Sequence, residues 1–398
     1  MGRKRVLIVS QHFLSGGIRS SLENLLPVLM ERFDVKVMAL CGSTTEFSRK
    51  YPGVVLPSPF LLSSALTSLS DLRTFNHFWL RLIIKIFTHG LCRVLDPERV
   101  ILGLARMCRK LDGYDCVIAY SHDNWFEDGG FFGGANEIAV KRAHARKKVA
   151  WIHGMPSVIG LTAGRVKRVY SGFDAIVTVS EACKREFESL SNKELACQVV
   201  YNLINDDEIR RKANEPVDQD WGNCFKIVTV SRLSRVAKRV DRVNVVARML
   251  KDAGYSFAWI VVGGGSEYER CVFESKQLGV DDCVTYVGEK SNPYPYMKNS
   301  DLVVVVSDSE AMPMVLREAM IVGTPVVTTN FPAAFESIED GKNGFVAERD
   351  PISLFSKIAY CIDHPEVLTL MREYIEKNPV NNKKSIEQIF ELIGDSEK

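Results

Sequence analysis

The sequence predicts an α/β protein of two doubly wound domains, each built on a parallel sheet. At 398 residues the chain is too long for one ordinary hydrophobic core. Short apolar runs alternate with helical patterns in both halves, and a polar segment separates the two halves. Hydrophobic residues make up 46% of the chain and charged residues 25%, which is ordinary for a globular protein.

The first domain is predicted over residues 1–205. Residues 5–10 form a continuous apolar run, typical of a parallel strand that is covered on both faces. A glycine turn at 15–17, an amphipathic helix over 18–33 and a second strand over 34–42 complete the first unit. Further strands are predicted over residues 116–121, 147–154, 175–180 and 197–202.

The second domain is predicted over residues 223–379, after a polar linker at 206–222. Strands and helices alternate again in this half, although no residue-level repeat relates it to the first. The expected strands are 225–233, the start of 257–279, 283–289, 301–307 and 324–330, and helices follow the first two. A closing helix at about 380–398 is a candidate to pack back on the first domain.

Charge and cysteine content exclude several classes of protein. The net charge of +2 gives no support to a nucleic-acid partner. The ten cysteines form no Cys-x-x-Cys pair and no cluster with metal-ligand spacing, which favours reduced thiols in the cytoplasm. No stretch reaches the ~20 uninterrupted apolar residues of a transmembrane helix. We therefore expect a cytoplasmic protein.

The stretch SDSEAMPMVLREAMIVGTPVV, residues 307–327, contains a predicted binding helix. Pro313 suits the first helical position, where its missing N–H costs nothing, and Gly323 suits the end. Free N–H groups near Met314 and Val315 would offer a site for a phosphate or a sugar hydroxyl.

Two glutamates bracket the start of this helix. Glu310 lies in the loop just outside, and Glu318 lies about 7.5 Å further along the axis at 1.5 Å per residue. This separation suits a nucleotide-sugar, with the sugar by Glu310, the diphosphate at the helix start and the ribose diol at Glu318. A carboxylate only accepts hydrogen bonds, so Glu318 can take both ribose hydroxyls.

Here the sequence resembles glycosyltransferase family 4, a group of retaining GT-B glycosyltransferases. Glu310 and Glu318 match the E-x7-E motif of that group, and the resemblance covers nearly the whole chain. It implies two Rossmann-like domains that face a central cleft. The C-terminal domain would bind the nucleotide-sugar, and the N-terminal domain would mostly bind the acceptor.

The resemblance also implies roles for particular residues. VSRLSRVAKRVDR is similar to the family segment in which Arg232 and Lys238 would hold the diphosphate. AWIHG places His153 near the donor sugar, and SGG at 15–17 resembles the glycine loop near the reaction centre. The predicted catalytic residues are His153, Glu310, Arg232 and Lys238. The predicted donor-binding residues are Gly16, Gly17, Gly264, Glu289, Ala311, Met312, Pro313, Met314, Val315 and Glu318.

The sequence departs from the family pattern at three places. Ala311 and Met312 follow the first glutamate, where the family commonly has glycine and an aromatic residue. The spacing from Arg232 to Lys238 is one residue longer than usual, so Arg235 or Arg239 are alternative phosphate ligands. The usual glycine after residue 202 is absent.

The predicted function is transfer of a sugar from a nucleotide-diphosphate sugar to a glycan or lipid-linked acceptor, with retention and without a metal or other cofactor. Arg232, Lys238 and the helix start would stabilise the departing diphosphate in place of a metal. Alternatives are a GT-B epimerase, a phosphorylase or a non-catalytic nucleotide-sugar-binding subunit. A dehydrogenase explains the sequence less well: Gly263, Gly265 and Glu289 mimic part of its fingerprint, but no third glycine follows.

Residues 73–93 combine basic and apolar residues. Arg73, His77, Arg81, Lys85, His89 and Arg93 recur at intervals of four, with no acidic residue before Asp96. Such a helix can lie peripherally on the anionic inner face of a membrane. It can equally be a helix packed on its own domain with solvated charges, and both interpretations stay open. On the membrane interpretation, Arg81 and Lys85 would contact lipid.

Overall fold

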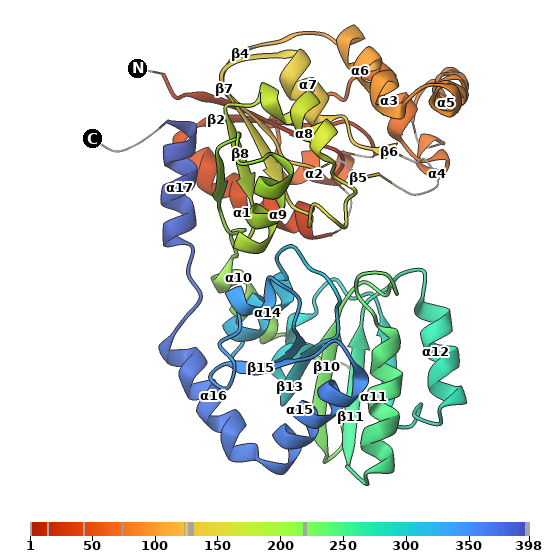
Figure 1. Ribbon diagram of the computed structural model, residues 1–398, viewed down its shortest axis with the longest axis vertical. Coiled ribbons are helices and arrows are strands. Elements are labelled where there is room, and N and C mark those ends of the chain that lie inside the picture. Colours follow the sequence, from red (N-terminus) through yellow and green to blue (C-terminus); the bar gives the residue numbers. More distant parts are fainter. Residues whose placement is uncertain are drawn as a thin grey trace. The chain divides into compact units, whose positions relative to one another are not determined.

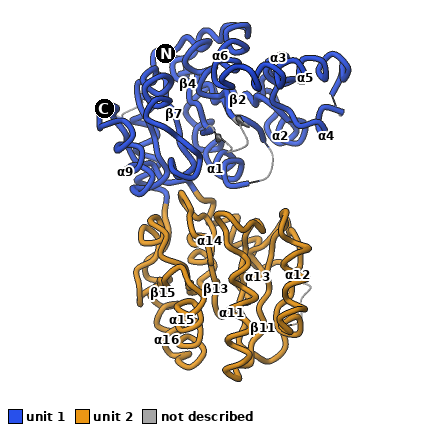
Figure 2. The backbone as a smooth tube through the Cα atoms, turned by 45° about the vertical axis from the view of Figure 1, so that its right-hand side comes forward, with its two compact units in different colours: residues 1–203, 382–398 blue, residues 204–381 orange. Residues whose placement is uncertain are grey.

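The computed structural model divides the chain into two compact units, coloured separately in Figure 2. Unit 1 comprises Met1–Leu203 and Asn382–Lys398, and unit 2 comprises Ile204–Asn381. The structure describes residues 2–13, 16–42, 44–73, 75–122, 124–125, 131–217 and 221–394. Ser15 and Thr74 therefore lie outside the described residues, as do 218–220 of the predicted linker and 395–398 of the closing helix.

Unit 1 is built on a seven-stranded parallel sheet with the order β3-β2-β1-β4-β7-β8-β9 (Figure 1). Its strands are β1 (Arg5–Ser10), β2 (Asp34–Ala39), β3 (Val55–Leu56), β4 (Leu111–Ala119), β7 (Ala143–Ile152), β8 (Ala175–Thr178) and β9 (Cys197–Val199). A separate antiparallel pair joins β5 (Asn124–Trp125) and β6 (Phe131–Phe132). The α/β class and its parallel strands are confirmed. The short strands β3, β5 and β6 were not predicted.

Helices surround this sheet. They are α1 (Gly17–Arg32), α2 (Thr45–Lys50), α3 (Phe60–Leu66), α4 (Leu69–Leu72), α5 (Phe78–Val94), α6 (Pro97–Met107), α7 (Ala135–Lys141), α8 (Ala163–Arg168), α9 (Glu181–Leu190) and α17 (Lys383–Ile393), with a 3-10 turn at Tyr170–Gly172. The four helices α3 to α6 form one insertion between β3 and β4. The closing helix α17 packs on unit 1, where Gln388 Nε2 donates to Val199 O at 3.0 Å.

Unit 2 is built on a six-stranded parallel sheet with the order β12-β11-β10-β13-β14-β15. Its strands are β10 (Phe225–Val230), β11 (Phe257–Val262), β12 (Val284–Gly288), β13 (Leu302–Val305), β14 (Val326–Thr329) and β15 (Gly344–Ala347). Its helices are α10 (Asp206–Ala213), α11 (Asp241–Asp252), α12 (Tyr268–Gln277), α13 (Tyr294–Lys298), α14 (Met314–Ile321), α15 (Pro351–Asp363) and α16 (Pro365–Lys377), with a 3-10 turn at Ala334–Glu336.

The predicted linker at 206–222 contains helix α10, so its first half is regular structure and not a connection. Asn205 caps this helix by accepting from Glu208 N at 3.0 Å. Ile209 is buried in a small apolar cluster with Ile204 and Ile321 of the same unit. A linker was expected because α10 has only two buried apolar side chains, Ile209 and Ala213, among many charges. Polarity alone does not distinguish such a helix from a loop.

Both sheets have the same topology around their first strand. In each unit the chain moves outward from the first strand in one direction, and then returns to add the fourth strand on the other side. The order therefore reverses between β1 and β4 in unit 1, and between β10 and β13 in unit 2. In open parallel sheets, ligands bind outside the carboxyl ends of the strands at such a reversal. Each unit thus offers one topologically favoured site.

Candidate functional site

At the reversal in unit 2, the loops that follow β10 and β13 bring a lysine and a glutamate together. Lys238 forms an ion pair with Glu310, and Ser307 Oγ donates to Glu310 Oε1 at 2.8 Å. Both charged side chains are largely covered, with 24% and 12% of their surface exposed. Cover of this kind strengthens the pair's electrostatic field relative to an exposed pair.

Asp308 connects these two loops through hydrogen bonds and ion pairs. Its backbone N–H donates to Ala237 O at 2.8 Å. Its carboxylate pairs with Arg239 at 2.9 Å and with Arg242 at 2.6 Å. Burial opposes ionisation of Asp308, but hydrogen bonds and charge from the two arginines outweigh it and lower its pKa. Asp308 thereby fixes the residue before Lys238 and lies two positions before Glu310.

The sequence did not identify Asp308 as part of the site. The available signal was its place shortly after a strand, with Arg239 in the loop after the neighbouring central strand and Arg242 in the first turn of the helix that follows. The buried guanidinium of Arg242 also donates to Val306 O at 2.8 Å, so it anchors the end of β13 itself.

Arg235 and Arg239, the alternative phosphate ligands, already form ion pairs with acidic side chains. Arg235 pairs with Glu267 at 2.9 Å and also with Glu274. Arg239 binds Asp241 through two nitrogens and Asp308 through a third. Arg232 differs, because its side chain is exposed and has no ion pair among the described residues. Of these three arginines, Arg232 is the one left available for an anion.

The glycine turn after β11 lies against the loop that carries Arg232. A Cβ on Gly263 would come within 1.8 Å of Ser231 O, and one on Gly265 within 2.4 Å of Leu233 O. Both glycines have positive φ, so neither position accepts a side chain. Gly264 Cα faces Glu289, whose side chain would lie 3.3 Å from a Cβ there. The predicted donor-binding residues Gly264 and Glu289 are therefore neighbours.

Helix α14 begins at Met314, with Pro313 as the residue before it in extended conformation. The expectation that Pro313 occupies the first helical position is therefore wrong by one residue. The helix start has no side-chain cap and no acidic residue in its first turn, which leaves its positive end uncompensated. Gly323, with φ of 82°, ends the helix as predicted.

Glu318 is the second carboxylate of the motif, and its surroundings change its acidity. Burial raises its pKa to about 7, and a hydrogen bond with the Tyr294 side chain only partly opposes this. Near neutral pH the carboxyl group is therefore divided between its protonated and ionised forms. Tyr294, on α13, was not predicted, because nothing in the sequence places α13 beside α14.

At the reversal in unit 1, the ends of β1 and β4 carry neutral polar groups. Ser10 and Ser121 hydroxyls lie 2.9 Å apart, and Ser121 Oγ accepts from Gln11 N at 2.8 Å. Ser21 of α1 donates to Asn202 Oδ1 at 2.7 Å and lies 2.6 Å from the Tyr120 hydroxyl. Because Ser21 has only one proton to give, Tyr120 donates to Ser21.

His153 follows β7 and lies beside this chain of hydroxyls. Its ring centre is 4.4 Å from that of Tyr120, edge to face. Burial, with a smaller effect from His122, lowers the pKa of His153 well below its ordinary value, so the imidazole is neutral at pH 7. Within the described residues, its buried Nε2 has no hydrogen-bond partner. His153 is therefore a neutral group beside this chain of hydroxyls, unpaired at Nε2 among the described residues. His122 and Tyr120 were not predicted, although both directly follow a strand.

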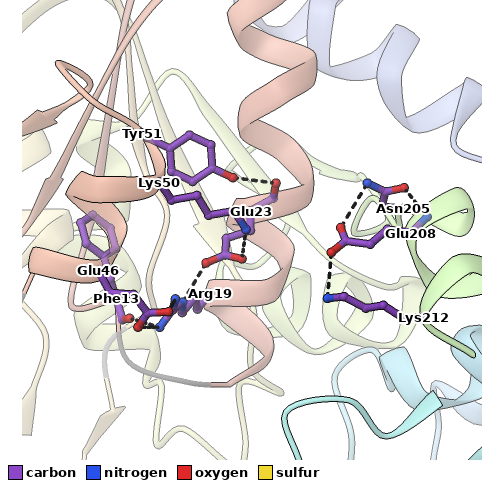
Figure 3. Close-up of polar contacts among 9 residues, drawn as sticks. All are labelled: Phe13, Arg19, Glu23, Glu46, Lys50, Tyr51, Asn205, Glu208 and Lys212. Atoms are coloured by element: carbon purple, nitrogen blue, oxygen red, sulfur yellow. Dashed lines mark hydrogen bonds and ion pairs between the residues drawn. The ribbon is translucent and has the colours of Figure 1, made fainter. Parts of the chain in front are cut away.

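Figure 3 shows the ion pairs that fix the beginning of α1, beside the glycine loop. Arg19 donates to Phe13 O at 3.1 Å and pairs with Glu46 at 2.7 Å and with Glu23 at 2.8 Å. Lys50 adds a pair with Glu23 at 2.7 Å. Gly16, the residue before the helix, has φ of 140°, a conformation that favours glycine. Gly17 is the first residue of α1, so both predicted glycines lie at the helix start.

Residues 73–93 form helix α5 from Phe78 onward, but two of the basic residues face the domain. Arg81 Nη1 donates to Ser63 Oγ at 2.7 Å, and its guanidinium stacks 4.4 Å from the Phe60 ring centre. Lys85 Nζ donates to Ala65 O at 3.2 Å. Both interpretations of this segment were left open, and for Arg81 and Lys85 the structure agrees with packing on the domain, because both side chains hold α5 on α3.

A cavity of about 620 Å³ lies in unit 1 at the base of the α3–α6 insertion. Both ends of the insertion line it, at residues 57–61 and 107–110, together with Met38 and Tyr114. None of the predicted catalytic or donor-binding residues lines this cavity. Across the described parts of the chain, no group of three or more His, Cys, Asp or Glu residues could hold a metal ion. No described helix is long and apolar enough to span a bilayer.

Comparison with protein families assigns the second half of the chain. Residues 207–378 match the family described as glycosyl transferases group 1. This range contains the Lys238–Glu310 pair, Asp308 and Glu318. Unit 2 belongs to the glycosyl transferases group 1 family.

Among curated proteins, the chain is similar to two enzymes over part of its length. It is 25% identical over 178 residues to N-acetyl-alpha-D-glucosaminyl L-malate synthase of Bacillus anthracis, covering 44% of this chain and 46% of that protein. It is 32% identical over 176 residues to lipopolysaccharide 1,6-galactosyltransferase of Salmonella typhimurium, covering 43% and 47%. The matches thus span less than half of the length of these relatives.

Solved structures extend the likeness to both halves of the chain. The Anabaena protein Alr3699/HepE, crystallised with UDP and glucose, matches 99% of this chain and 100% of its own with a TM-score of 0.69 and 17% identity. At this identity the likeness establishes the fold. Both units together therefore have the GT-B fold, with two Rossmann-like domains, which confirms the fold class predicted from the sequence. The family match, over residues 207–378, agrees with the resemblance predicted for the second half of the chain.

Proposed function

We propose that this protein is a retaining glycosyltransferase that uses a nucleotide-diphosphate sugar as donor and needs no metal. The observation that carries the proposal is the Lys238–Glu310 pair, supported by Ser307 at the reversal point of a group 1 glycosyltransferase domain. The relatives named above act on sugars by their names, and Alr3699/HepE was crystallised with UDP and glucose.

We assign the diphosphate to Lys238, Arg232 and the start of α14. Lys238 is paired with Glu310, and an entering diphosphate would compete for the same ammonium group. Release of Glu310 would then free its carboxylate to accept from hydroxyls of the donor sugar. Binding of the donor diphosphate would thus make Glu310 available to the donor sugar.

In the proposed reaction, the bond between the sugar and the diphosphate breaks and the acceptor oxygen bonds to the same face of the sugar. The acceptor proton passes to the departing phosphate oxygen. Charge therefore grows on the diphosphate in the transition state, where the fixed positive groups of Lys238 and Arg232 stabilise it most. His153, Gly16 and Gly17 in unit 1 stay predicted as groups near the sugar, and Glu318 as the ribose ligand.

The acceptor is proposed to be a glycan or a lipid-linked glycan of cell-surface polysaccharide synthesis, bound mainly by unit 1. The name of the lipopolysaccharide galactosyltransferase relative supports this class of acceptor.

A thermal-shift panel of UDP-, GDP- and ADP-sugars tests the donor assignment. A true donor at one hundred times its dissociation constant should stabilise the protein by about 2.7 kcal/mol. Product analysis by NMR, with and without chelator, then reads the anomeric configuration and the need for metal. Epimerised nucleotide-sugar formed without acceptor would replace this proposal by an epimerase, and donor binding without any turnover would indicate a binding subunit.

A further inference from the structure

Helix α5 exposes a row of large apolar side chains along its outer face. The residues of this row, termed the α5 apolar face, are 52 to 83% exposed. They are Trp79, Leu80, Ile83, Ile86, Phe87 and Val94. At 3.6 residues per turn these positions share one side of the helix, whereas Thr88, its one buried residue, lies opposite. Apolar residues on a helix that faces its own core would be buried, and these are not.

The α5 apolar face is held outward by contacts on the opposite side of the helix. Arg81 binds Ser63, and Lys85 binds Ala65 O, so both basic residues tie α5 to α3. Burial lowers the pKa of Lys85 and of Arg81, in agreement with their position against the domain. The helix, labelled in Figure 1, is therefore docked in a defined orientation. Its exposed apolar side is a feature of the folded unit.

The charges around this face identify what would cover it. No acidic residue occurs between Asp71 and Asp96, so the helix carries positive charge only. His89 and Arg93 are exposed and lie along one edge of the apolar face. A helix of 17 residues is about 25 Å long at 1.5 Å per residue. A long apolar side with an exposed tryptophan and a basic edge is the pattern of helices that lie in a bilayer interface.

We propose that α5 docks unit 1 on an anionic lipid bilayer, with the α5 apolar face inserted among the acyl chains. His89 and Arg93 then lie at the level of the headgroups, where they attract anionic lipid. Binding is mainly hydrophobic, because the two most central basic residues face the protein. The proposal does not depend on the sugar chemistry proposed above.

Co-sedimentation of the full chain with phosphatidylcholine vesicles, with and without phosphatidylglycerol, tests the proposal. We expect the wild type to bind both kinds and to prefer the anionic one. The double variant Ile83→Ser, Phe87→Ser removes two residues that are 63% and 66% exposed, so its melting temperature should be unchanged while vesicle binding falls at least about tenfold. A matched control, Phe273→Ser with Phe335→Ser, removes residues of unit 2 that are 59% and 60% exposed and should bind like the wild type.

Two results would overturn the proposal. If the wild type stays in the supernatant with both kinds of vesicle at low salt, α5 does not dock on lipid. If light scattering shows a wild-type dimer that Ile83→Ser, Phe87→Ser converts to a monomer, and vesicles bind neither form, the face is covered by a second copy of the chain. Blue-shifted emission from Trp79 on vesicle binding, absent in a Trp79→Phe variant, would support insertion.

Discussion

The reversal points of the two sheets share a topology and differ in chemistry. In unit 2 the ends of β10 and β13 carry ion pairs, centred on Lys238 with Glu310 and on Asp308 with two arginines. In unit 1 the ends of β1 and β4 carry hydroxyl and amide groups joined by neutral hydrogen bonds, as between Ser21 and Tyr120. One sheet order thus supports a charged site and a neutral one. The fold provides the location, and the residues after each strand determine the ligand.

The largest expected effect comes from removing the central charge of unit 2. Lys238→Ala should lower kcat by about 10² to 10³, or roughly 3 to 4 kcal/mol, because a fixed charge beside the departing diphosphate acts mostly in the transition state. The donor Michaelis constant should change much less. Steady-state kinetics on the purified variant measures both constants. Wild-type turnover would remove Lys238 from the site.

The next largest effect is expected on the stability of unit 2, when the charge of Asp308 is removed. Asp308→Asn keeps the size of the side chain but leaves Arg239 and the buried Arg242 without their shared carboxylate. We expect a loss of about 2 to 3 kcal/mol in the free energy of unfolding, since a covered charge is left uncompensated. Asp282→Asn is the matched control, because its pair with Lys251 is exposed and should cost less than ~1 kcal/mol. Equal losses in both variants would contradict the special role of Asp308.

A third test uses the acidity of Glu318. Its pKa of about 7 in the free protein means that binding two ribose hydroxyls requires release of a proton below that pH. Donor affinity should therefore fall as pH drops, by roughly tenfold per unit well below 7, and should level off above 8. Glu318→Gln should weaken the donor by about 1 to 3 kcal/mol at pH 8 and remove the pH dependence. Calorimetric titration at several pH values measures this, and a wild-type slope in the variant would reject the assignment.

Glu318 should also make the free energy of unfolding depend on pH. This stability should fall as pH rises, whereas donor affinity should increase. Its folded pKa lies above the ordinary value of 4.5, so the ionised folded state is penalised, and stability is lost as pH rises from about 5 through 7. The free Glu318→Gln variant should therefore melt higher than the wild type at pH 8, and the difference should shrink at pH 5.5. Thermal melts without donor test this. A variant that is less stable at both pH values would show that the carboxylate contributes to folding.

Arg232→Ala should have a smaller kinetic effect than the change at Lys238, on the order of tenfold in kcat, because the guanidinium is exposed and solvent weakens its field. Its stability should match that of the wild type within ~0.5 kcal/mol, since no ion pair is lost among the described residues. Kinetics and a thermal melt on one preparation check both statements. A large loss of stability would mean that Arg232 is structural.

The last expected effect lies in the neutral hydrogen bonds of unit 1 and concerns stability only. Ser21→Ala leaves the buried Tyr120 hydroxyl and Asn202 Oδ1 each without this partner, which should cost about 1 to 2 kcal/mol of stability. Ser189→Ala is a suitable control, because that hydroxyl is exposed and bonds only within its own helix. Urea unfolding curves compare the two. Salt should leave the Ser21 effect unchanged, whereas it should reduce the effect of Asp308→Asn.

The sequence predicted the parts of this protein that local pattern determines. The apolar run of β1, the helix end at Gly323 and the E-x7-E pair are all read from neighbouring residues. Asp308 and Tyr294 were missed, because their importance depends on arginines and a helix that are distant in the sequence. The side of α5 that Arg81 and Lys85 occupy could not be predicted, since spacing by four shows which residues share a stripe and not which side meets the domain.

The return of α17 to unit 1 has a consequence for how the protein is made. Its buried Ile389, the Phe390 ring 6.0 Å from Phe33 and the Gln388 contact with β9 complete the packing of unit 1. The ribosome synthesises this helix only after the whole of unit 2, so unit 1 cannot complete its packing until unit 2 has been made. A released chain that is truncated after Asn381 should therefore leave this apolar surface of unit 1 uncovered, and protease should cut unit 1 more readily than unit 2.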